Sequence, residues 1–484
     1  MTGAAARVST TYLIASVALA GLAACAVGPN YHPPLLPEHA AAPLVSVNPK
    51  LEAAVQPPAA WWRLYDDPRL DQLVQQALAA NRDLAAAEAN LAAARAVVSE
   101  VHAARYPSTE AIAGGVYGRD PVTDEILELG GHRPQTLWLF EDVFQAAYEV
   151  DLFGRVHRTI EAAHANAESV AAARDSVRIV VAANTARAYA AICALGEELG
   201  VARRSLDIVT QEAEIAAQRY DAGGGSQFDV KRAQAVVAEV RATIPQVEGA
   251  RRAALFELTA LLGQTPTDAP KNLDACVAPP RLTALIPVGD GRSLIRRRPD
   301  VRQAERRLAA ATATIGVATA GLYPSIRLSG FFGGAATEVS ELNTNPARIW
   351  GVGPSISWAF PNQAGPRARV RQAKASEQAA LASFDSVVLT ALKETEQSLT
   401  AYGSDLAHRQ ALAEAQTNLQ DAFQVARSGY AAGSLSTLDL LTTEQSLVAV
   451  DAEVASSDAG LIQDQIAIFN ALGGGWQSEG PMKP

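Results

Sequence analysis

The sequence contains few of the features that catalysis, metal binding or nucleic-acid binding require. Its 484 residues include three cysteines, whose spacing fits neither a metal site nor a redox pair. Aromatic residues make up only 6%, and the net charge of −10 argues against nucleic acid, a partner that requires a basic face. We find no Ser/His/Asp or Cys/His arrangement. The sequence therefore predicts a protein that is not an enzyme and has no metal site and no cofactor.

Beyond the N-terminus the sequence has no apolar run of about 18 residues without charges, so no further membrane-spanning helix is expected. The N-terminus itself has a weak basic region at Arg7, an apolar stretch over residues 12–20, and a Leu-Ala-Ala triplet directly before Cys25. This order predicts a secretory signal peptide over residues 1–24. It resembles a bacterial lipoprotein signal, which implies cleavage before Cys25 and lipidation of that residue. The alternative is an ordinary signal peptide with an incidental cysteine.

Three further residues bear on location and redox state. Ala26 follows Cys25 at a position where Asp would resemble an inner-membrane retention signal, so delivery to the outer membrane is the expectation. Cys193 lies in an Ala-rich helical stretch and Cys276 in a Pro-rich one. We expect both to be free, inert thiols, and a disulfide between them is the less favoured alternative.

One pattern occurs twice in the chain. Residues 298–301 (Arg-Pro-Asp-Val) precede an Ala- and Arg-rich run that ends in Tyr-Pro-Ser at 323–325, and residues 83–108 repeat this pattern 217 positions earlier (300 minus 83). A second matching pair begins at Tyr220 and Tyr430, 210 positions apart (430 minus 220). A unit of about two hundred residues is a whole subdomain, which predicts a tandem duplication. The expected parts are a tether at 25–60, repeats at 61–280 and 281–475, and a tail at 476–484.

Each repeat contains two stretches with the strand period of two. In the first repeat, the even positions from Trp138 to Leu152 are mainly apolar and the odd positions mainly polar; in the second, residues 350–360 alternate between large apolar and small residues. The strands that begin after Pro107 and Pro324 alternate less regularly. Strands of about ten residues with one apolar face suit a membrane barrel. A half-buried sheet in a soluble domain is the alternative.

Four strands cannot close a membrane barrel, because the smallest known barrels have about eight. Open strand edges cannot remain in lipid. If the strands span a membrane, several copies of the chain must therefore contribute to one barrel.

Long helical stretches follow each strand pair. The first is predicted over residues 155–220, about 100 Å at 1.5 Å per residue, and the second over 370–430. Glycine-containing breaks follow both, and return helices are predicted over 228–262, interrupted near Pro245, and up to residue 472. Their Ala-rich faces suit packing between two neighbours in a ring of helices. A shorter helix is expected to start at Asp67-Pro68, with Asp as the cap.

Taken together, these features resemble the TolC-like outer-membrane channel family, in its lipoprotein (NodT-type) branch. The residues that carry the resemblance are Cys25 with residues 27–31 (Val-Gly-Pro-Asn-Tyr), Trp61-Trp62 with Asp67-Pro68, residues 297–301, both Tyr-Pro-Ser triplets, and residues 151–155 (Asp-Leu-Phe-Gly-Arg). The resemblance implies an α+β membrane protein that forms a homotrimer. Its outer-membrane β-barrel would take four strands from each chain and continue into a long periplasmic α-helical barrel.

The resemblance also implies a function and partners. The protein would be a passive duct, anchored by lipid in the outer membrane, in a tripartite efflux system that exports drugs or other toxic compounds. Its partners would be a periplasmic adaptor protein and an inner-membrane pump, expected to be proton-driven, with an ATP-driven pump as the alternative. The competing hypotheses are a periplasmic helical scaffold lipoprotein without a pore and an outer-membrane enzyme.

The family's periplasmic gate maps onto residues near the second helical turn. Leu438 matches a position that forms an apolar constriction in some relatives, and Asp439 matches an aspartate that lines the entrance in others. Three such aspartates around a threefold axis would draw cations. The sequence departs from the family at Thr442, where a second aspartate is common, and at Leu435, the position of a gate arginine. An apolar plug of Leu435 and Leu438 is therefore expected instead of an ionic latch.

Alternatives remain for the residues at the turns. Asp229 and Asp439 could instead cap the helices that follow the turns. Gly223 and Gly433 are expected to form the turns themselves, and the resemblance adds adaptor docking at these positions.

Two other clusters are discounted as sites. His157, Glu161, His164 and Glu168 share a helical face but lack the His-Glu-x-x-His spacing of zinc proteases, so a solvated face is favoured. The arginines between residues 292 and 307 are expected to form a solvated helix start, balanced by Asp300 and Glu305.

Overall fold

The computed structural model describes residues 26–48, 52, 53, 55–119, 125, 128–131, 133, 136–282 and 285–474. The predicted signal peptide at 1–24, the predicted lipidation residue Cys25 and the predicted tail at 476–484 lie outside these residues. The chain forms two compact units. Unit 1 comprises residues 1–34, 92–169 and 304–383, and unit 2 comprises residues 35–91, 170–303 and 384–484.

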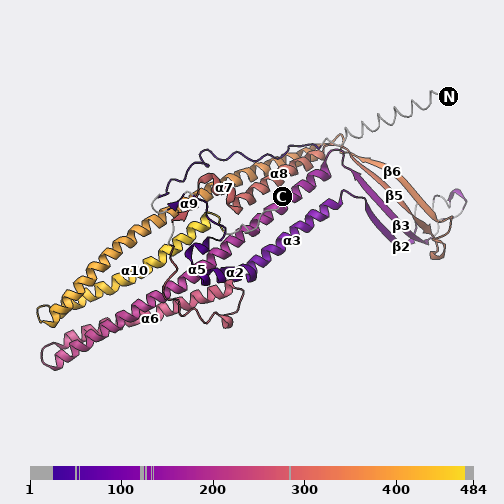
Figure 1. The fold of residues 1–484 in the computed structure, drawn as a ribbon. Helices are drawn as coiled ribbons and strands as arrows, with labels where there is room; N and C mark the ends of the chain where they lie inside the picture. The colour runs from indigo at the N-terminus through magenta and orange to yellow at the C-terminus, as the bar shows by residue number, and fades with distance from the viewer. Residues whose placement is uncertain are drawn as a thin grey trace. The chain divides into compact units, whose positions relative to one another are not determined.

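Helices dominate the described part of the chain (Figure 1). They are η1 (Trp61–Tyr65), α2 (Pro68–Ala80), α3 (Arg82–Ala103), α5 (Arg155–Asp221), α6 (Gln227–Leu261), η2 (Pro266–Asp268), α7 (Gly291–Arg297), α8 (Pro299–Ala320), η3 (Val339–Glu341), α9 (Ala364–Ala431) and α10 (Thr437–Ala471). The two predicted long helices are confirmed as α5, with 67 residues, and α9, with 68 residues. Both return helices are confirmed as α6 and α10.

Unit 1 contains the predicted strands, which form one antiparallel sheet in the order β2-β3-β5-β6. The strands are β2 (Ser108–Gly118), β3 (Leu137–Val150), β5 (Ser325–Ala336) and β6 (Arg348–Ser357). Among the described residues, β2 pairs only with β3 and β6 pairs only with β5. The sheet is therefore open at both edges within one chain.

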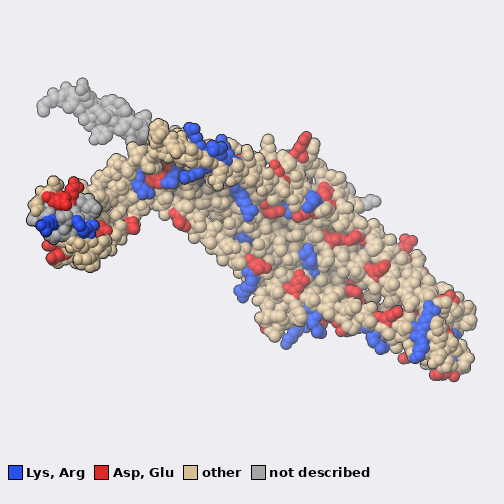
Figure 2. All heavy atoms as spheres, turned by 180° about the vertical axis from the view of Figure 1, so that it is seen from behind, with Lys and Arg blue, Asp and Glu red and all other residues tan. Residues whose placement is uncertain are grey.

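The strand register places large apolar side chains of neighbouring strands on one face. Tyr117 pairs with Trp138 across β2 and β3, and Phe332 of β5 lies between Phe144 of β3 and Trp350 of β6. The side chain of Trp350 is 72% exposed, although burial would be expected for an aromatic residue in a soluble domain. Figure 2 shows few charged side chains over the strands between their loop end and the helices. The predicted apolar face is thus confirmed.

The opposite face of the same sheet is more polar. Glu149 of β3, Arg327 of β5 and Ser355 of β6 are paired across the sheet and share this face. Two charged residues fall on the apolar face: Arg348, at the start of β6, and Asp142 of β3. Its carboxylate accepts a hydrogen bond from the Gly334 backbone N–H at 2.8 Å, so that charge is compensated by a backbone donor.

The largest hydrophobic core lies in unit 2 and is organised around Trp61, which is fully buried. Its ring stacks on Phe469 of α10 at a centroid distance of 4.7 Å. The helix start predicted at Asp67-Pro68 is confirmed: the Asp67 carboxylate accepts from the backbone N–H of Arg69 at 2.8 Å. Within the described residues, α5 alone is long and apolar enough to cross a membrane, but 72% of that window is buried in the protein. This stretch of α5 is therefore a core helix.

The segment predicted as an extended tether is pinned to unit 2 after residue 34. The backbone N–H groups of Val45 and Ser46 donate to the Glu396 carboxylate of α9 at 2.7 and 2.8 Å. Further along, β1 (Glu52–Ala53) pairs in parallel with β4 (Ile286–Pro287), near the start of the second predicted repeat. The predicted tether is thus held to unit 2 at both places.

The prediction of a solvated start for the arginine-rich stretch is wrong for Arg297 and Arg298, which are buried. Arg297 Nε donates to the Leu472 carbonyl at 2.6 Å, and Arg298 Nη1 donates to the Ala471 carbonyl at 2.8 Å. Arg298 also pairs with Asp300 at 2.7 Å. The last carbonyls of α10, which have no partner within their own helix, are satisfied by these two guanidinium groups.

The predicted interruption at Pro245 is also wrong, because α6 runs through this residue. Proline removes one N–H donor and crowds the preceding turn. Pro245 is exposed, however, as are Arg241 and Ala242 in the preceding turn, so water can satisfy the freed carbonyl. An exposed surface lets the helix continue without a break.

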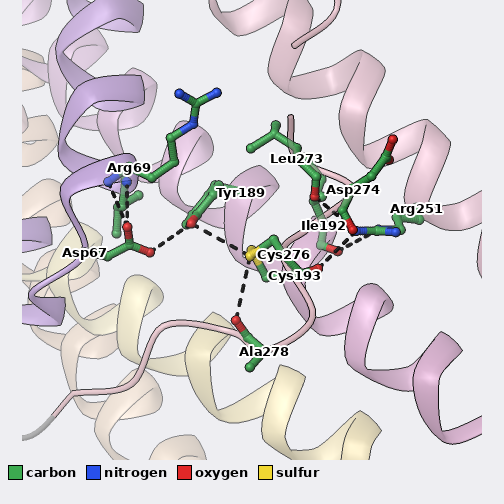
Figure 3. The surroundings of a disulfide bond; sticks show 11 residues. Asp67, Arg69, Tyr189, Ile192, Cys193, Arg251, Leu273, Asp274, Cys276 and Ala278 are labelled. Carbon is green, nitrogen blue, oxygen red and sulfur yellow. Dashed lines mark hydrogen bonds between the residues drawn. A yellow bond between two sulfur atoms is a disulfide. The ribbon is translucent and has the colours of Figure 1, made fainter. Parts of the chain in front are cut away.

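The expectation of two free thiols is wrong, because Cys193 and Cys276 form a disulfide (Figure 3). Cys193 is fully buried in α5. The loop that contains Cys276 approaches α5 so closely that a Cβ at Gly196 would lie 2.2 Å from the Cys276 carbonyl oxygen. Arg251 of α6 holds the same loop, donating to the carbonyls of Leu273 at 3.0 Å and Asp274 at 2.9 Å. The bond joins residues 83 positions apart, so no local spacing indicates it.

Candidate functional site at the helical hairpin turns

Unit 2 contains two helical hairpins that end in glycine turns. Gly223, after α5, has φ +78°, and Gly433, after α9, has φ +75°. These left-handed conformations favour glycine, and no atom lies within 4 Å of a Cβ built at either position. The prediction that both glycines form the turns is confirmed. Their exposed surroundings leave room for a docked protein, and this role stays a prediction.

The two aspartates that follow the turns lie in matching caps. Ser436 Oγ accepts from the Asp439 backbone N–H at 3.2 Å and donates to the Asp439 carboxylate at 2.7 Å. Ser226 and Asp229 form the same reciprocal arrangement at the start of α6. The hydrogen bonds from Ser436 lower the pKa of the Asp439 carboxyl, which is fully exposed. The alternative role as helix caps is confirmed, and the cap at Asp439 leaves an ionised carboxylate at the second turn.

The other predicted gate residues surround Asp439. The Leu438 side chain is 49% exposed, whereas Leu435 folds back so closely that a Cβ at Gly429 would lie 2.7 Å from its Cδ1. Thr442 Oγ1 donates to the Leu438 carbonyl at 2.8 Å, within its own helix. The turn of one chain therefore presents an exposed leucine beside an ionised carboxylate.

The ends of the two long helices are joined by a pair that the sequence analysis missed. Arg219 Nη2 of α5 donates to the Tyr430 carbonyl of α9 at 2.9 Å. The guanidinium carbon also lies 3.9 Å from the centroid of the Tyr430 ring, a cation–π distance. The repeat pattern includes Tyr430 and its counterpart Tyr220. It does not include Arg219, which directly precedes Tyr220.

Three charged residues meet close to these turns. Glu444 of α10 is 1% exposed, and neither of its carboxylate oxygens has a hydrogen-bond partner among the described residues. Burial, together with the charge of Glu212 on α5, raises the pKa of Glu444 to about 7. Arg427 of α9 opposes this rise, and its Nε lies 3.4 Å from Glu212 Oε1. Two buried carboxylates thus share one arginine.

The sequence contains a signal for the burial of Glu444. It lies three residues after Leu441 and three before Leu447, both of which are buried, so it occupies an apolar position of the α10 stripe. An acid at such a position is a candidate for a shifted pKa. Nothing in the sequence indicated which residues of α5 and α9 would face it.

The segment that follows Cys25 contains residues 27–31, which carry part of the resemblance described above. In unit 1 it packs on α5 and α8: a Cβ at Gly28 would lie 2.5 Å from the Gly316 Cα, so the backbones are nearly in contact. Tyr31 donates to Glu305 at 2.9 Å, and the buried Arg158 donates to Asn30 Oδ1 at 2.7 Å. The Val-Gly-Pro-Asn-Tyr motif is therefore held against these two helices.

The family model described as "Outer membrane efflux protein" matches residues 73–264 and 292–474. The Nodulation protein T of Rhizobium leguminosarum bv. viciae is 29% identical over 458 residues, covering 94% of this chain and 92% of that protein. The "Probable outer membrane lipoprotein SilC" of Salmonella typhimurium is 28% identical and covers 86% of this chain and 88% of its own length.

A solved structure extends the similarity to the fold. The outer-membrane channel OprN superposes with a TM-score of 0.86 at 36% sequence identity. The match covers 94% of this chain and all of the OprN chain. The match spans residues of both units.

Proposed function

Because the chain belongs to the outer membrane efflux protein family, we propose that three copies assemble into one passive duct through the outer membrane and periplasm. The protein is the outer-membrane channel component of a tripartite efflux system, and it extends from the outer membrane into the periplasm. Our proposal adds to this role the assembly of three chains and the continuous duct that they form.

One observation carries the trimer: the sheet of a single chain has four strands, an exposed apolar face and two open edges among the described residues. Lipid offers no hydrogen-bond partners, so strands that cross a membrane must have all their edges paired. Four strands are too few to close a barrel, whereas three chains supply twelve. Edge β2 of one copy would then pair with edge β6 of the next.

The duplication is supported by the two segments that match the same family model, one in each predicted repeat. A duplicated chain in a trimer gives six similar units around one axis. Each unit would supply one strand pair to the barrel and one long helical hairpin to the periplasmic tunnel.

At the periplasmic end we propose a gate formed by Leu435, Leu438, Asp439 and Thr442 of three chains. The exposed Leu438 side chains would meet near the axis and exclude water and ions. The ionised Asp439 carboxylates would surround the entrance and favour cations there. Gly223 and Gly433, at the hairpin turns, would receive the periplasmic adaptor.

Lipidation of Cys25 would add an acyl anchor in outer-membrane lipid. The similarity to a protein described as an outer membrane lipoprotein supports this step, as does the close packing of residues 28–31 on α5 and α8. Each buried methylene contributes about 0.8 kcal/mol to such an anchor. The inner-membrane partner is proposed to be a proton-driven pump, and the cargo to be drugs or other toxic compounds.

Planar bilayers test the duct. Purified trimer should conduct ions weakly, and Leu438→Gly should conduct several-fold more because it removes the apolar constriction. Absence of conductance from both proteins would favour a helical scaffold without a pore. Cys25→Ser protein should remain in membranes during a high-salt wash, because the strands hold it there. Release by salt would show that the strands do not span the bilayer.

A further inference from the structure

Unit 1 contains a pocket of about 650 Å³ that none of the roles above uses. It lies on α8 and is bordered by residues at the start of α5 and α9. Its size is within the range of pockets that hold drug-sized molecules. Small apolar side chains, among them Ala311, Val317 and Ala318, form part of its lining.

The charged residues that line this pocket are all of one sign. Arg155, Arg307 and Arg369 border it, and no Asp or Glu does, although the chain as a whole has a net charge of −10. Arg155 is paired with Glu149 at the end of β3. Arg307 and Arg369 are exposed, and no carboxylate pairs with either one in the described part of the chain. Two guanidinium groups are thus available to an anion.

The residues of α8 that line the pocket indicate whether it faces the inside or the outside of the proposed duct. Glu305 and Gly316, which contact the N-terminal segment, lie along one face of α8. The pocket residues Arg307, Thr314 and Ala318 lie along the opposite face, since successive residues are turned by about 100°. An acyl chain on Cys25 has to enter lipid outside the barrel, so the side that bears the N-terminal segment is the outer one.

We propose that this pocket faces the interior of the duct and binds amphipathic organic anions. The apolar lining takes the hydrocarbon body, and Arg307 and Arg369 bind a carboxylate or sulfonate. The inference rests on the proposed duct for its orientation, and it adds a substrate class to it. Threefold symmetry gives three such sites, with six unpaired arginines facing one lumen. The site thus opposes the cation preference expected at the Asp439 entrance.

Two measurements test the anion-binding site and the duct separately. The first is calorimetric titration of the detergent-solubilised trimer with naphthalene-1,5-disulfonate, with 1,5-dihydroxynaphthalene as the uncharged analogue. The second is block of the current through the open Leu438→Gly channel by the same disulfonate. The test variant is Arg307→Gln/Arg369→Gln, and Arg307→Lys/Arg369→Lys is the conservative variant. Arg371→Gln is the matched control, because Arg371 is exposed on α9 and does not line the pocket.

The unaltered trimer should bind the disulfonate at least tenfold more tightly than the diol. The double Gln variant should lose at least tenfold in affinity and in block while conducting normally. The Lys variant should retain most of both, and Arg371→Gln should match the unaltered protein. Equal binding by the unaltered and double Gln proteins would overturn the site. Arginine-dependent binding without any conductance would support the binding site but refute the duct. Arginine-dependent binding without block of a conducting channel would overturn the luminal orientation.

Discussion

Arg219 and Tyr430 are 211 residues apart in sequence, yet the guanidinium of one donates to the carbonyl of the other and lies over its ring. A charge-assisted hydrogen bond contributes about 1.5–3 kcal/mol and a cation–π contact about 0.5–2 kcal/mol. If the ends of α5 and α9 must separate for the duct to open, this pair favours the closed state.

Arg219→Ala should therefore raise the open probability in planar bilayers by at least tenfold. Tyr430→Phe should have little effect, because it keeps both the ring and the carbonyl. Arg203→Ala is the matched control. Arg203 of α5 pairs with Glu248 of α6, so this ion pair joins α5 to its return helix and not to α9. The two side chains are 60% and 45% exposed. Unchanged gating in Arg219→Ala would show that the pair is structural only.

Protonation of Glu444 should stabilise the packing near the turns. Its folded pKa of about 7 is above the usual carboxyl value of 4.5, so the folded state holds a proton that an exposed carboxyl has lost. The stabilisation is complete below about pH 4.5 and is lost as the pH rises through about 7. Amide exchange in α10 around residue 444, corrected for its intrinsic pH dependence, should thus be slower at pH 5.5 than at pH 8.

Glu444→Gln should remove this pH dependence and keep exchange slow at both pH values, because the amide never ionises. Glu212→Gln should weaken the dependence, since the second negative charge is gone. Glu453→Gln changes an exposed carboxyl of the same helix and should leave the profile unaltered. A pH profile that survives Glu444→Gln would assign the effect to another group.

The two faces of β6 should tolerate charge very differently. Val352 is 74% exposed on the apolar face, whereas Gly353 next to it faces the opposite side, and no atom lies within 4 Å of a Cβ added there. Arginine on a lipid-facing strand residue near the midplane costs about 2–4 kcal/mol. Val352→Arg should reduce the yield of heat-resistant trimer in membranes severalfold, whereas Gly353→Arg should assemble normally. Equal yields would argue against lipid contact on this face.

The disulfide should stabilise unit 2. In the chain-entropy model, closing a loop of 83 residues restricts the unfolded chain by about 4–5 kcal/mol. Cys193→Ser/Cys276→Ser should unfold at a lower temperature than the oxidised protein, and reductant should lower the melting temperature of the unaltered protein toward the same value. Coincident melting of oxidised and doubly substituted protein would show that the bond adds nothing.

The sequence allowed prediction of elements whose cause is local. Alternation from Trp138 onward predicted β3 and its apolar face, and Asp67-Pro68 predicted the start of α2, because caps and periods act within a few residues. Pairings between distant segments could not be predicted. Cys193 meets Cys276, and Arg298 meets the end of α10, only after the linker and the helices have packed. Whether Pro245 breaks α6 likewise depended on its exposure, which is a tertiary property.

At the candidate site, the same division applies. The turn glycines and the capping aspartates were predictable, since both are local devices. The burial of Glu444 was indicated by its place among leucines, but its neighbours Glu212 and Arg427 come from helices whose relative rotation no single-helix pattern specifies.

The open edges of β2 and β6 have a genetic consequence. In the proposed trimer, one edge-defective chain is enough to leave the barrel open. In a cell that makes normal chains and edge-defective chains in equal amounts, random assembly leaves only about one complex in eight wholly normal. A damaged allele of this gene should therefore suppress an intact one carried beside it, and the sensitivity to toxic compounds should be dominant.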